Sequence, residues 1–347
     1  MKTIKTIGYC ALFSSAINCA IADPDEGLKR GENPNSAKFS IALIGDLPYS
    51  QAQEPEFVNL MVDLDEADVA FTVHDGDFKG GSAMCNDDIY QLRLEQFNAS
   101  KHPFFYVFGD NEWTDCHRPA AGGYNPFERL SYLRDLFSHY DQPVSMGKEH
   151  LHLERQSQEF PENIRWNYGG VLFVGLHVPG SNNGLSTRAD LKSAAEQEYA
   201  QRNAANLQWL EDSFALADDQ QAAGIMLFIQ ANPWDFIPAA NLTGYEDFIV
   251  ALEAKTKAFE KPVVLVHGDS HYFRIDKPLP SALPSQVKDA DFPYIMPWES
   301  GTPRLHNFTR VETFGNPNSH WVKATIDRHD PSVFSFEEQI VEKNLAP

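Results

Sequence analysis

The sequence predicts an α/β protein built on largely parallel, buried strands. Short β-rich apolar runs recur along the 347-residue chain, at residues 39–44, 69–73, 104–108, 171–176, 225–229 and 263–266. Segments with helical apolar spacing lie between several of these runs, as at 57–64 and 207–214. Alternation of strand-like and helix-like segments is typical of a mostly parallel sheet whose faces are covered by helices.

The balance of charges limits the partners of this chain. It has 28 Lys and Arg against 49 Asp and Glu, a formal net charge of -21. Nucleic acids and anionic lipid surfaces are held by a basic face that releases counterions, so this composition argues against both. An anionic ligand must instead be held by local positive charge, such as a metal ion or a few cationic side chains. The 42% apolar content indicates a globular protein with a substantial core.

The first 22 residues have the pattern of a secretory signal. Lys2 and Lys5 precede a mostly apolar run at 7–21, and Ala20-Ile21-Ala22 resembles a cleavage site. An uncleaved anchor is the alternative, but about 15 apolar residues fall short of the roughly 20 that span a bilayer. We therefore expect a signal peptide at 1–22, one domain at 23–347, a secreted or periplasmic location and no integral membrane association. Nothing in the sequence indicates the oligomeric state.

Cleavage would leave two of the four cysteines, Cys85 and Cys116, in an oxidising compartment. We expect them to form a disulfide that ties together two loops. Two free buried thiols are the alternative.

The last part of the sequence differs from the rest in composition and in the spacing of its apolar runs. Residues 278–303 form a Pro-rich stretch, and a loop of that length is often a lid or a binding loop. Segments 310–313, 321–326 and 333–336 follow it and are interpreted as a run of antiparallel strands.

Acidic residues stand at the ends of the apolar runs. Asp46 follows the first run, Asp77 the second, Asp110 the third and Asp269 the sixth. The carboxyl ends of strands in an open α/β sheet form the ligand crevice, so these residues should converge. Packed carboxylates repel one another unless a cation intervenes, and the natural cation is a divalent metal ion.

The order of these motifs resembles that of the calcineurin-like metallophosphoesterases over residues 38–275. The motifs are Gly45-Asp46, Gly76-Asp77, 109–112, 230–233 and 268–271. The resemblance implies a two-sheet α/β-β/α sandwich with a strand-rich C-terminal end, a dinuclear metal centre and hydrolysis of phosphomonoesters or phosphodiesters. It also implies that Asp46 is a first-metal ligand, that Asp77 bridges both metals, and that His271 is the last histidine ligand.

The motifs also depart from the family pattern. Pro48 stands where a first-metal histidine is usual, and Asp269 replaces the first histidine of the last motif. Asp110 takes the position of a second-metal asparagine. Asn111 stands where the catalytic histidine is usual and is expected to contact the phosphate. Either Gln230 or Asn232 falls where the fourth motif has a histidine, and the sequence leaves this choice open.

The departures exchange nitrogen ligands for oxygen ligands. An oxygen-rich site favours hard ions, so we expect one or two divalent ions per chain, with Mg²⁺, Mn²⁺ or Ca²⁺ preferred over Zn²⁺.

Further polar residues are candidates for substrate chemistry. A proton donor is sought among His74, His177 and His267 at strand ends and His117 in a loop, with Arg118 as a phosphate clamp. His267 is also a candidate for substrate binding. The ordinary alternatives are hydrogen-bonded strand-end histidines and a solvated loop.

Two asparagines lie in a predicted tight turn at the same edge of the sheet. Asn182 and Asn183, within 180–184, are candidates for substrate binding. The predicted function is a secreted, metal-dependent hydrolase of a small phosphorylated substrate. The alternative is a non-catalytic protein that binds a metal or a phosphorylated ligand on the same scaffold.

Overall fold

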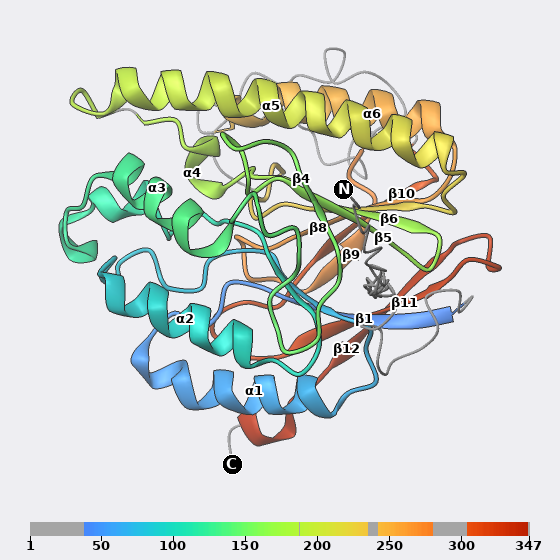
Figure 1. The fold of residues 1–347 in the computed structure, drawn as a ribbon, viewed down its shortest axis with the longest axis horizontal. Helices are drawn as coiled ribbons and strands as arrows, with labels where there is room; N and C mark the ends of the chain where they lie inside the picture. Colours follow the sequence, from blue (N-terminus) through green and yellow to red (C-terminus); the bar gives the residue numbers. More distant parts are fainter. Residues whose placement is uncertain (1–37, 187, 235–241, 280–303, 346–347) are drawn as a thin grey trace, which may run out of the picture. The chain divides into compact units, whose positions relative to one another are not determined.

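A computed structural model describes residues 38–186, 188–234, 242–279 and 304–345. The predicted signal peptide at 1–22 and nearly all of the Pro-rich stretch at 278–303 lie outside these residues. The described chain forms an α/β sandwich of two mixed sheets, which confirms the predicted fold class (Figure 1).

The five-stranded sheet has the order β12-β11-β1-β2-β3, and the seven-stranded sheet has the order β4-β5-β6-β7-β8-β10-β9. The strands are β1 (Lys38–Ile44), β2 (Thr72–His74), β3 (Phe104–Tyr106), β4 (Glu154–Arg155), β5 (Ile164–Tyr168), β6 (Val171–Gly175), β7 (Ile225–Phe228), β8 (Val263–His267), β9 (Arg274–Asp276), β10 (Phe308–Glu312), β11 (Trp321–Asp327) and β12 (Phe334–Gln339). The α-helices are α1 (Glu54–Glu66), α2 (Asp87–Ala99), α3 (Pro126–Phe137), α4 (Gly180–Asn183), α5 (Lys192–Asp219) and α6 (Glu246–Phe259).

All six apolar runs of the sequence analysis contain strands, and these strands pair mostly in parallel. β1, β2 and β3 run parallel in one sheet, and β6, β7, β8 and β10 do so in the other. The expected antiparallel run at the C-terminal end is right for β11 and β12. It is wrong for β10, which lies in the seven-stranded sheet, parallel to β8 and antiparallel to β9, because the chain returns to that sheet before it crosses to the other.

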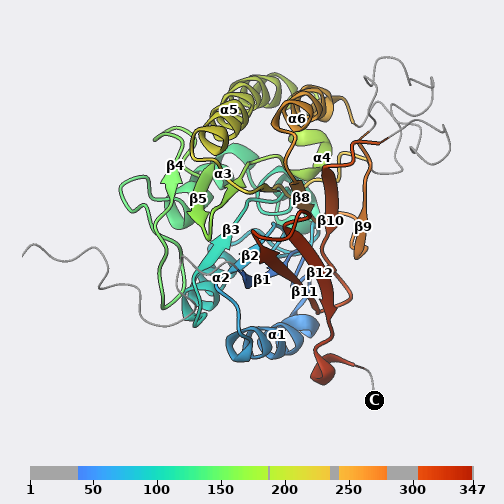
Figure 2. The same ribbon diagram turned by 90° about the vertical axis from the view of Figure 1, so that its right-hand side faces the viewer.

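Alternating side chains divide the core into layers. Along β1, Ile41 and Leu43 face the other sheet, whereas Ala42 and Ile44 face helices α1 and α2. Helices α5 and α6 cover the outer face of the seven-stranded sheet, and α1, α2 and α3 cover that of the five-stranded sheet (Figures 1 and 2). Both faces of each central strand are therefore dry, which explains the continuous apolar runs.

An aromatic stack joins the two sheets. The ring of Phe105 on β3 lies 3.7 Å from that of Trp166 on β5, at an interplanar angle of 3°. Trp166 in turn stacks on Phe228 of β7, with centroids 5.8 Å apart. None of the helices in the described parts of the chain is both long enough and apolar enough to cross a bilayer.

The stack predicts a large effect of truncation. Replacing Phe105, which is 1% exposed, by alanine should lower the free energy of unfolding by about 3–5 kcal/mol, because it leaves a cavity between the sheets. Urea denaturation measures this change. The control is Val58→Ala on α1, a residue 52% exposed, which should change stability by less than about 0.5 kcal/mol. Equal losses in the two variants would contradict the assignment of Phe105 to the core.

Candidate metal centre

Carboxylates from three strand ends meet at one edge of the sandwich. Oxygens of Asp77, after β2, Asp110, after β3, and Asp269, after β8, all lie within 4.8 Å of one another. We call these three residues the acidic triad. Asp46, after β1, is not part of the triad, and its Oδ2 instead accepts a hydrogen bond from the backbone N–H of Asp269 at 2.9 Å.

The glycines of the motifs allow this close packing. A β-carbon on Gly268 would lie 1.9 Å from Oδ2 of Asp46, and one on Gly109 would lie 2.0 Å from Oδ1 of Asp77. The aspartates themselves take left-handed backbone conformations, with φ of 53° at Asp46 and 58° at Asp77. Such values are uncommon outside glycine, and aspartate is among the residues that tolerate them.

The triad brings three acidic groups together where they are largely shielded from solvent. Burial, the charge of Asp110 and the charge of Glu112 together raise the pKa of Asp77 well above its ordinary value. Burial likewise raises the pKa of Asp110, although a hydrogen bond from Ser181 and the charge of Arg118 oppose the change. Both shifts report a site in which ionised carboxylates lack compensation.

Among the described residues, the side chains of Asp77 and Asp110 accept their hydrogen bonds from Tyr49, Asn111 and Ser181, not from a lysine or arginine. The nearby buried Lys79 donates to the carbonyl oxygens of Asn111, at 2.6 Å, and Gly80, at 3.1 Å. Oδ1 of Asp110 is buried and makes no hydrogen bond. An unpartnered carboxylate oxygen among three carboxylates fits a divalent cation, because such an oxygen is otherwise costly to bury.

Neighbouring polar groups hold the triad in place. Asn111 donates its backbone N–H to Oδ1 of Asp77, at 3.0 Å, and its side-chain amide to Oδ2, at 2.6 Å. The Ser181 hydroxyl donates to Oδ2 of Asp110 at 2.6 Å. Gln230 reaches Oδ1 of Asp269 at 3.3 Å through Nε2. Through these contacts Asn111 positions the Asp77 carboxylate. Its predicted contact with phosphate stays a prediction.

Gln230 and Asn232, the two candidate ligands of the fourth motif, differ in where their side chains point. The side chain of Gln230 points to the triad, and its Oε1 accepts the backbone N–H of Gly180 at 2.5 Å. The side chain of Asn232 donates to the Ser270 hydroxyl at 2.6 Å, and only its backbone N–H reaches Asp269. Gln230 is therefore the better placed of the two predicted ligands.

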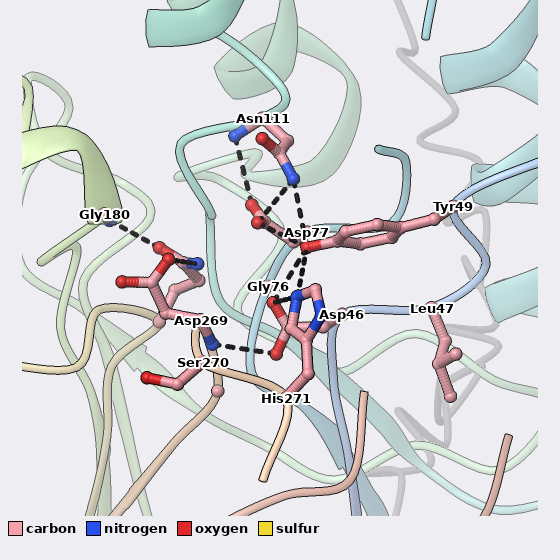
Figure 3. A network of polar contacts seen from close by, with 12 residues as sticks. Asp46, Leu47, Tyr49, Gly76, Asp77, Asn111, Gly180, Asp269, Ser270 and His271 are labelled. Atoms are coloured by element: carbon pink, nitrogen blue, oxygen red, sulfur yellow. Dashed lines mark hydrogen bonds and ion pairs between the residues drawn. The ribbon is translucent and has the colours of Figure 1, made fainter. Parts of the chain in front are cut away.

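Tyr49 is a residue that the sequence analysis did not single out. Its hydroxyl lies between Asp46, Asp77, Asn111 and His271 (Figure 3). Burial and the charges of Asp46 and Asp77 raise its pKa well above the ordinary value. The only sequence feature that could have indicated Tyr49 is its position three residues after Asp46, because a residue so close can reach the same strand end.

His271 lies beside Asp46. Its Nε2 is 3.6 Å from Oδ1 of Asp46. Burial lowers the pKa of His271, but the hydrogen bond and charge of Asp46 outweigh it, so the net pKa is raised.

Two other predicted histidines, His74 and His267, are buried at strand ends and hydrogen-bonded to backbone groups, and their predicted roles toward a substrate stay predictions. Nε2 of His74 donates to the carbonyl of Leu47 at 3.0 Å, and its Nδ1 accepts the N–H of Gly76. Burial lowers its pKa to about 4. His267 is wholly buried, and its Nδ1 contacts the carbonyl of Gly268. Both side chains support the loops that carry the aspartates.

His177 at the end of β6 is also structural. It is buried against Trp113 and contacts Glu162 at 3.0 Å. Burial lowers the pKa of His177 to about 4.

A pocket of about 370 Å³ opens beside the triad. Its lining includes Asp269 and Ser181, and also His117 and Arg118. Arg118 is paired with Asp115 at 2.7 Å and is 44% exposed. Asn182 lines the pocket, whereas Asn183 is buried and hydrogen-bonded to Gly244 and Arg202, and its predicted contact with substrate stays a prediction.

The predicted disulfide is present and connects two loops of the site. Cys85 and Cys116 are bonded, with Cα atoms 5.7 Å apart. The bridge links the segment after Asp77 to the short 3₁₀ helix η2 (Thr114–His117), which carries His117. By the chain-entropy estimate, closing a loop of this size stabilises the fold by about 3–4 kcal/mol.

Comparisons with known proteins show a similarity in structure alone. No protein-family model and no curated protein sequence matches the chain. A purple acid phosphatase from yellow lupin (Lupinus luteus) seeds is 13% identical with a TM-score of 0.48, over 91% of this chain. Vacuolar Protein Sorting 29 from Cryptosporidium parvum is 9% identical with a TM-score of 0.31, over 87% of this chain and 97% of its own. This chain spans 56% of the lupin protein.

The buried carboxyls predict a pH-dependent stability. Burial raises the pKa of Glu112, beside the triad, from 4.5 to about 7, despite the opposing charge of Lys79. A raised folded-state pKa contributes stability that is present below the unfolded value and lost as the pH rises through about 7. The melting temperature of chelator-treated protein should therefore fall between pH 5 and pH 8.

Glu112→Gln should flatten this dependence, measured by differential scanning fluorimetry across the pH range. Glu337→Gln on the exposed edge strand β12 serves as the matched control and should leave the slope unchanged. A wild-type melting temperature that rises over this range would contradict the assignment.

Proposed function

We propose that this chain is an exported, metal-dependent phosphoester hydrolase that acts on a small phosphorylated molecule. The observation that carries the proposal is the acidic triad, with three carboxylates within 4.8 Å of one another and a buried Asp110 oxygen that has no hydrogen-bond partner.

Asp77, Asp110 and Asp269 would hold the ion. An all-carboxylate set favours a hard cation such as Mg²⁺, Mn²⁺ or Ca²⁺. When bound, a divalent ion would neutralise phosphoryl oxygens and lower the pKa of water. The chain supplies the rest: Asn111 and Ser181 orient the carboxylates, and the pocket holds the remainder of the substrate.

The pocket combines cationic and apolar walls. Arg118 can reach an anionic oxygen with a guanidinium group, which binds phosphate in a bidentate manner. The apolar part of the lining consists of Trp113, Phe127, Leu185, Leu191, Leu242 and Tyr245. This mixture suits a phosphate ester whose leaving group has an apolar or aromatic portion.

His117 is the best placed proton donor of the predicted set. Its Nδ1 contacts the carbonyl of Thr114 at 2.6 Å, which orients the ring, and the residue lines the pocket. The other ring nitrogen is then the one available for passing a proton to a departing alkoxide. Export is supported by the apolar N-terminal segment and by the Cys85–Cys116 bridge, since disulfides persist in oxidising compartments.

A non-catalytic binding protein is the second candidate function. It is favoured by Asn111, whose two amide hydrogens are directed to Asp77 and Tyr49 rather than to the pocket. Such a protein would use the triad to hold an ion or a phosphorylated ligand without turning it over.

Ion binding and turnover separate the two functions. Chromogenic phosphomonoesters and phosphodiesters should be hydrolysed in the presence of Mg²⁺ or Mn²⁺. Asp110→Asn should lower kcat/KM by at least about 100-fold, because it removes a charged ligand, and Asp212→Asn on the exposed face of α5 should have no effect. Ion uptake without turnover would support the binding protein, and no ion uptake in calorimetry would contradict both the metal-dependent hydrolase and an ion-binding protein.

Leaving-group chemistry tests His117. His117→Gln should lower kcat for an alkyl phosphate by about 100-fold but for 4-nitrophenyl phosphate by less than about 5-fold, since a good leaving group departs without a proton. Lys192→Ala, at the exposed start of α5, is the control. Equal losses with both substrates would exclude His117 as the proton donor.

A further inference from the structure

The Tyr49 hydroxyl lies at the centre of four polar groups contributed by four different loops. It is 3.1 Å from Oδ1 of Asp46 and 2.9 Å from Oδ2 of Asp77. Nδ2 of Asn111 is 3.1 Å away, and Nε2 of His271 is 3.0 Å away. Figure 3 shows the ring of Tyr49 reaching this point from one side, with the other groups facing it.

The groups around this oxygen are of the kind that hold a divalent ion. Two carboxylates and an imidazole are common ligands for such ions in proteins, and they bind at roughly 2.0–2.6 Å. Here they converge instead on an oxygen atom of the chain, at the separations of hydrogen bonds. The position that an ion would need is therefore filled by a side chain.

The hydrogen bonds of the Tyr49 hydroxyl are complete without an ion. The Tyr49 hydroxyl has one hydrogen to donate and can accept two, and Asn111 and an imidazole N–H of His271 can supply those two. The proton of the hydroxyl is then available for a carboxylate, of which Asp77 is the nearer. His271 also lies beside Asp46, with its Nε2 3.6 Å from Oδ1 of that residue.

The loop that carries Tyr49 is held in place. The backbone N–H of Tyr49 donates to Oε1 of Gln53 at 2.8 Å. Its ring packs edge-on against that of His271, with centroids 4.9 Å apart. Gly80 lies close to it, since a β-carbon there would be 2.9 Å from the Tyr49 carbonyl oxygen. These contacts therefore fix the position of the Tyr49 hydroxyl within the site.

The side of the site around Tyr49 and the side around Asp110 differ in whether a buried carboxylate oxygen lacks a hydrogen-bond partner. Around Tyr49, both oxygens of Asp77 and Oδ2 of Asp46 accept hydrogen bonds, and Oδ1 of Asp46 shares the single Tyr49 hydroxyl proton with Asp77. On the side of the triad, Oδ1 of Asp110 is buried without a partner. The need for a cation is thus confined to the triad.

We propose that the Tyr49 hydroxyl takes the place of a second cation, so that the centre binds one divalent ion per chain, at the acidic triad. This inference rests on the metal site of the proposed function. Removing the phenol should open a second position, bounded by Asp46, Asp77 and His271.

The test is the ion content of the whole chain, equilibrated with excess Mn²⁺, desalted and analysed by mass spectrometry, with calorimetric titration as a second measure. The wild type should bind one ion, and Tyr49→Ser should bind two. Asp46→Asn in the Tyr49→Ser background should return the content to one. Tyr272→Ser, at a tyrosine 67% exposed on the surface, is the control and should bind one ion.

The outcomes separate this inference from the proposed function. Two ions in the wild type, or one ion in a Tyr49→Ser variant with native circular dichroism, would overturn the role of Tyr49 and leave a metal-dependent function intact. No ion in the wild type would overturn the metal site itself. If Tyr49→Ser does not fold, the wild-type content still decides between one ion and two.

Discussion

The repulsion among carboxylates that a sheet edge forces together is the constraint on which this site depends. Parallel strands deliver their C-terminal residues to one edge, and Asp77, Asp110 and Asp269 arrive there with oxygens within 4.8 Å of one another. Burial removes the water that would otherwise screen them. The surrounding structure responds with donors, since Asn111, Ser181 and Gln230 each point a hydrogen at one of the three.

The same constraint explains why the two halves of the site are built differently. Near Asp46 the space between the carboxylates is filled by groups of the protein, the hydroxyl of Tyr49 and the imidazole of His271. At Asp110 one buried oxygen has no partner within the described chain. A polar network that is fully satisfied gains rigidity, whereas one with a missing partner is costly unless a ligand completes it. The site thus combines a rigid half with a half suited to a cation, next to a pocket with both cationic and apolar walls.

Much of the fold follows from apolar patterning. The runs at 39–44 and 263–266 became central strands because side chains on both of their faces are buried, so the continuous apolar signal was strong. β4, β9 and the parallel pairing of β10 were not predicted. β4 and β9 are short and lie at sheet edges, where few contacts leave a trace in the sequence. The direction of β10 depends on which sheet the chain joins after residue 304, a choice made by long-range packing.

The sequence by itself determined which residues stand at the strand ends, because strand termination and the following glycine and aspartate are local properties. It could therefore point to Asp77, Asp110 and Asp269, and to the pairing of Cys85 with Cys116. Only the tertiary structure decided that Asp46 stands outside the triad, that His74 and His267 face the interior, and that Tyr49 fills the space between Asp46 and Asp77. Sequence spacing indicates at which strand end a side chain lies, but not which other side chains it contacts. Those contacts can come from distant segments, as with Tyr49 and His271, which are separated by 222 residues.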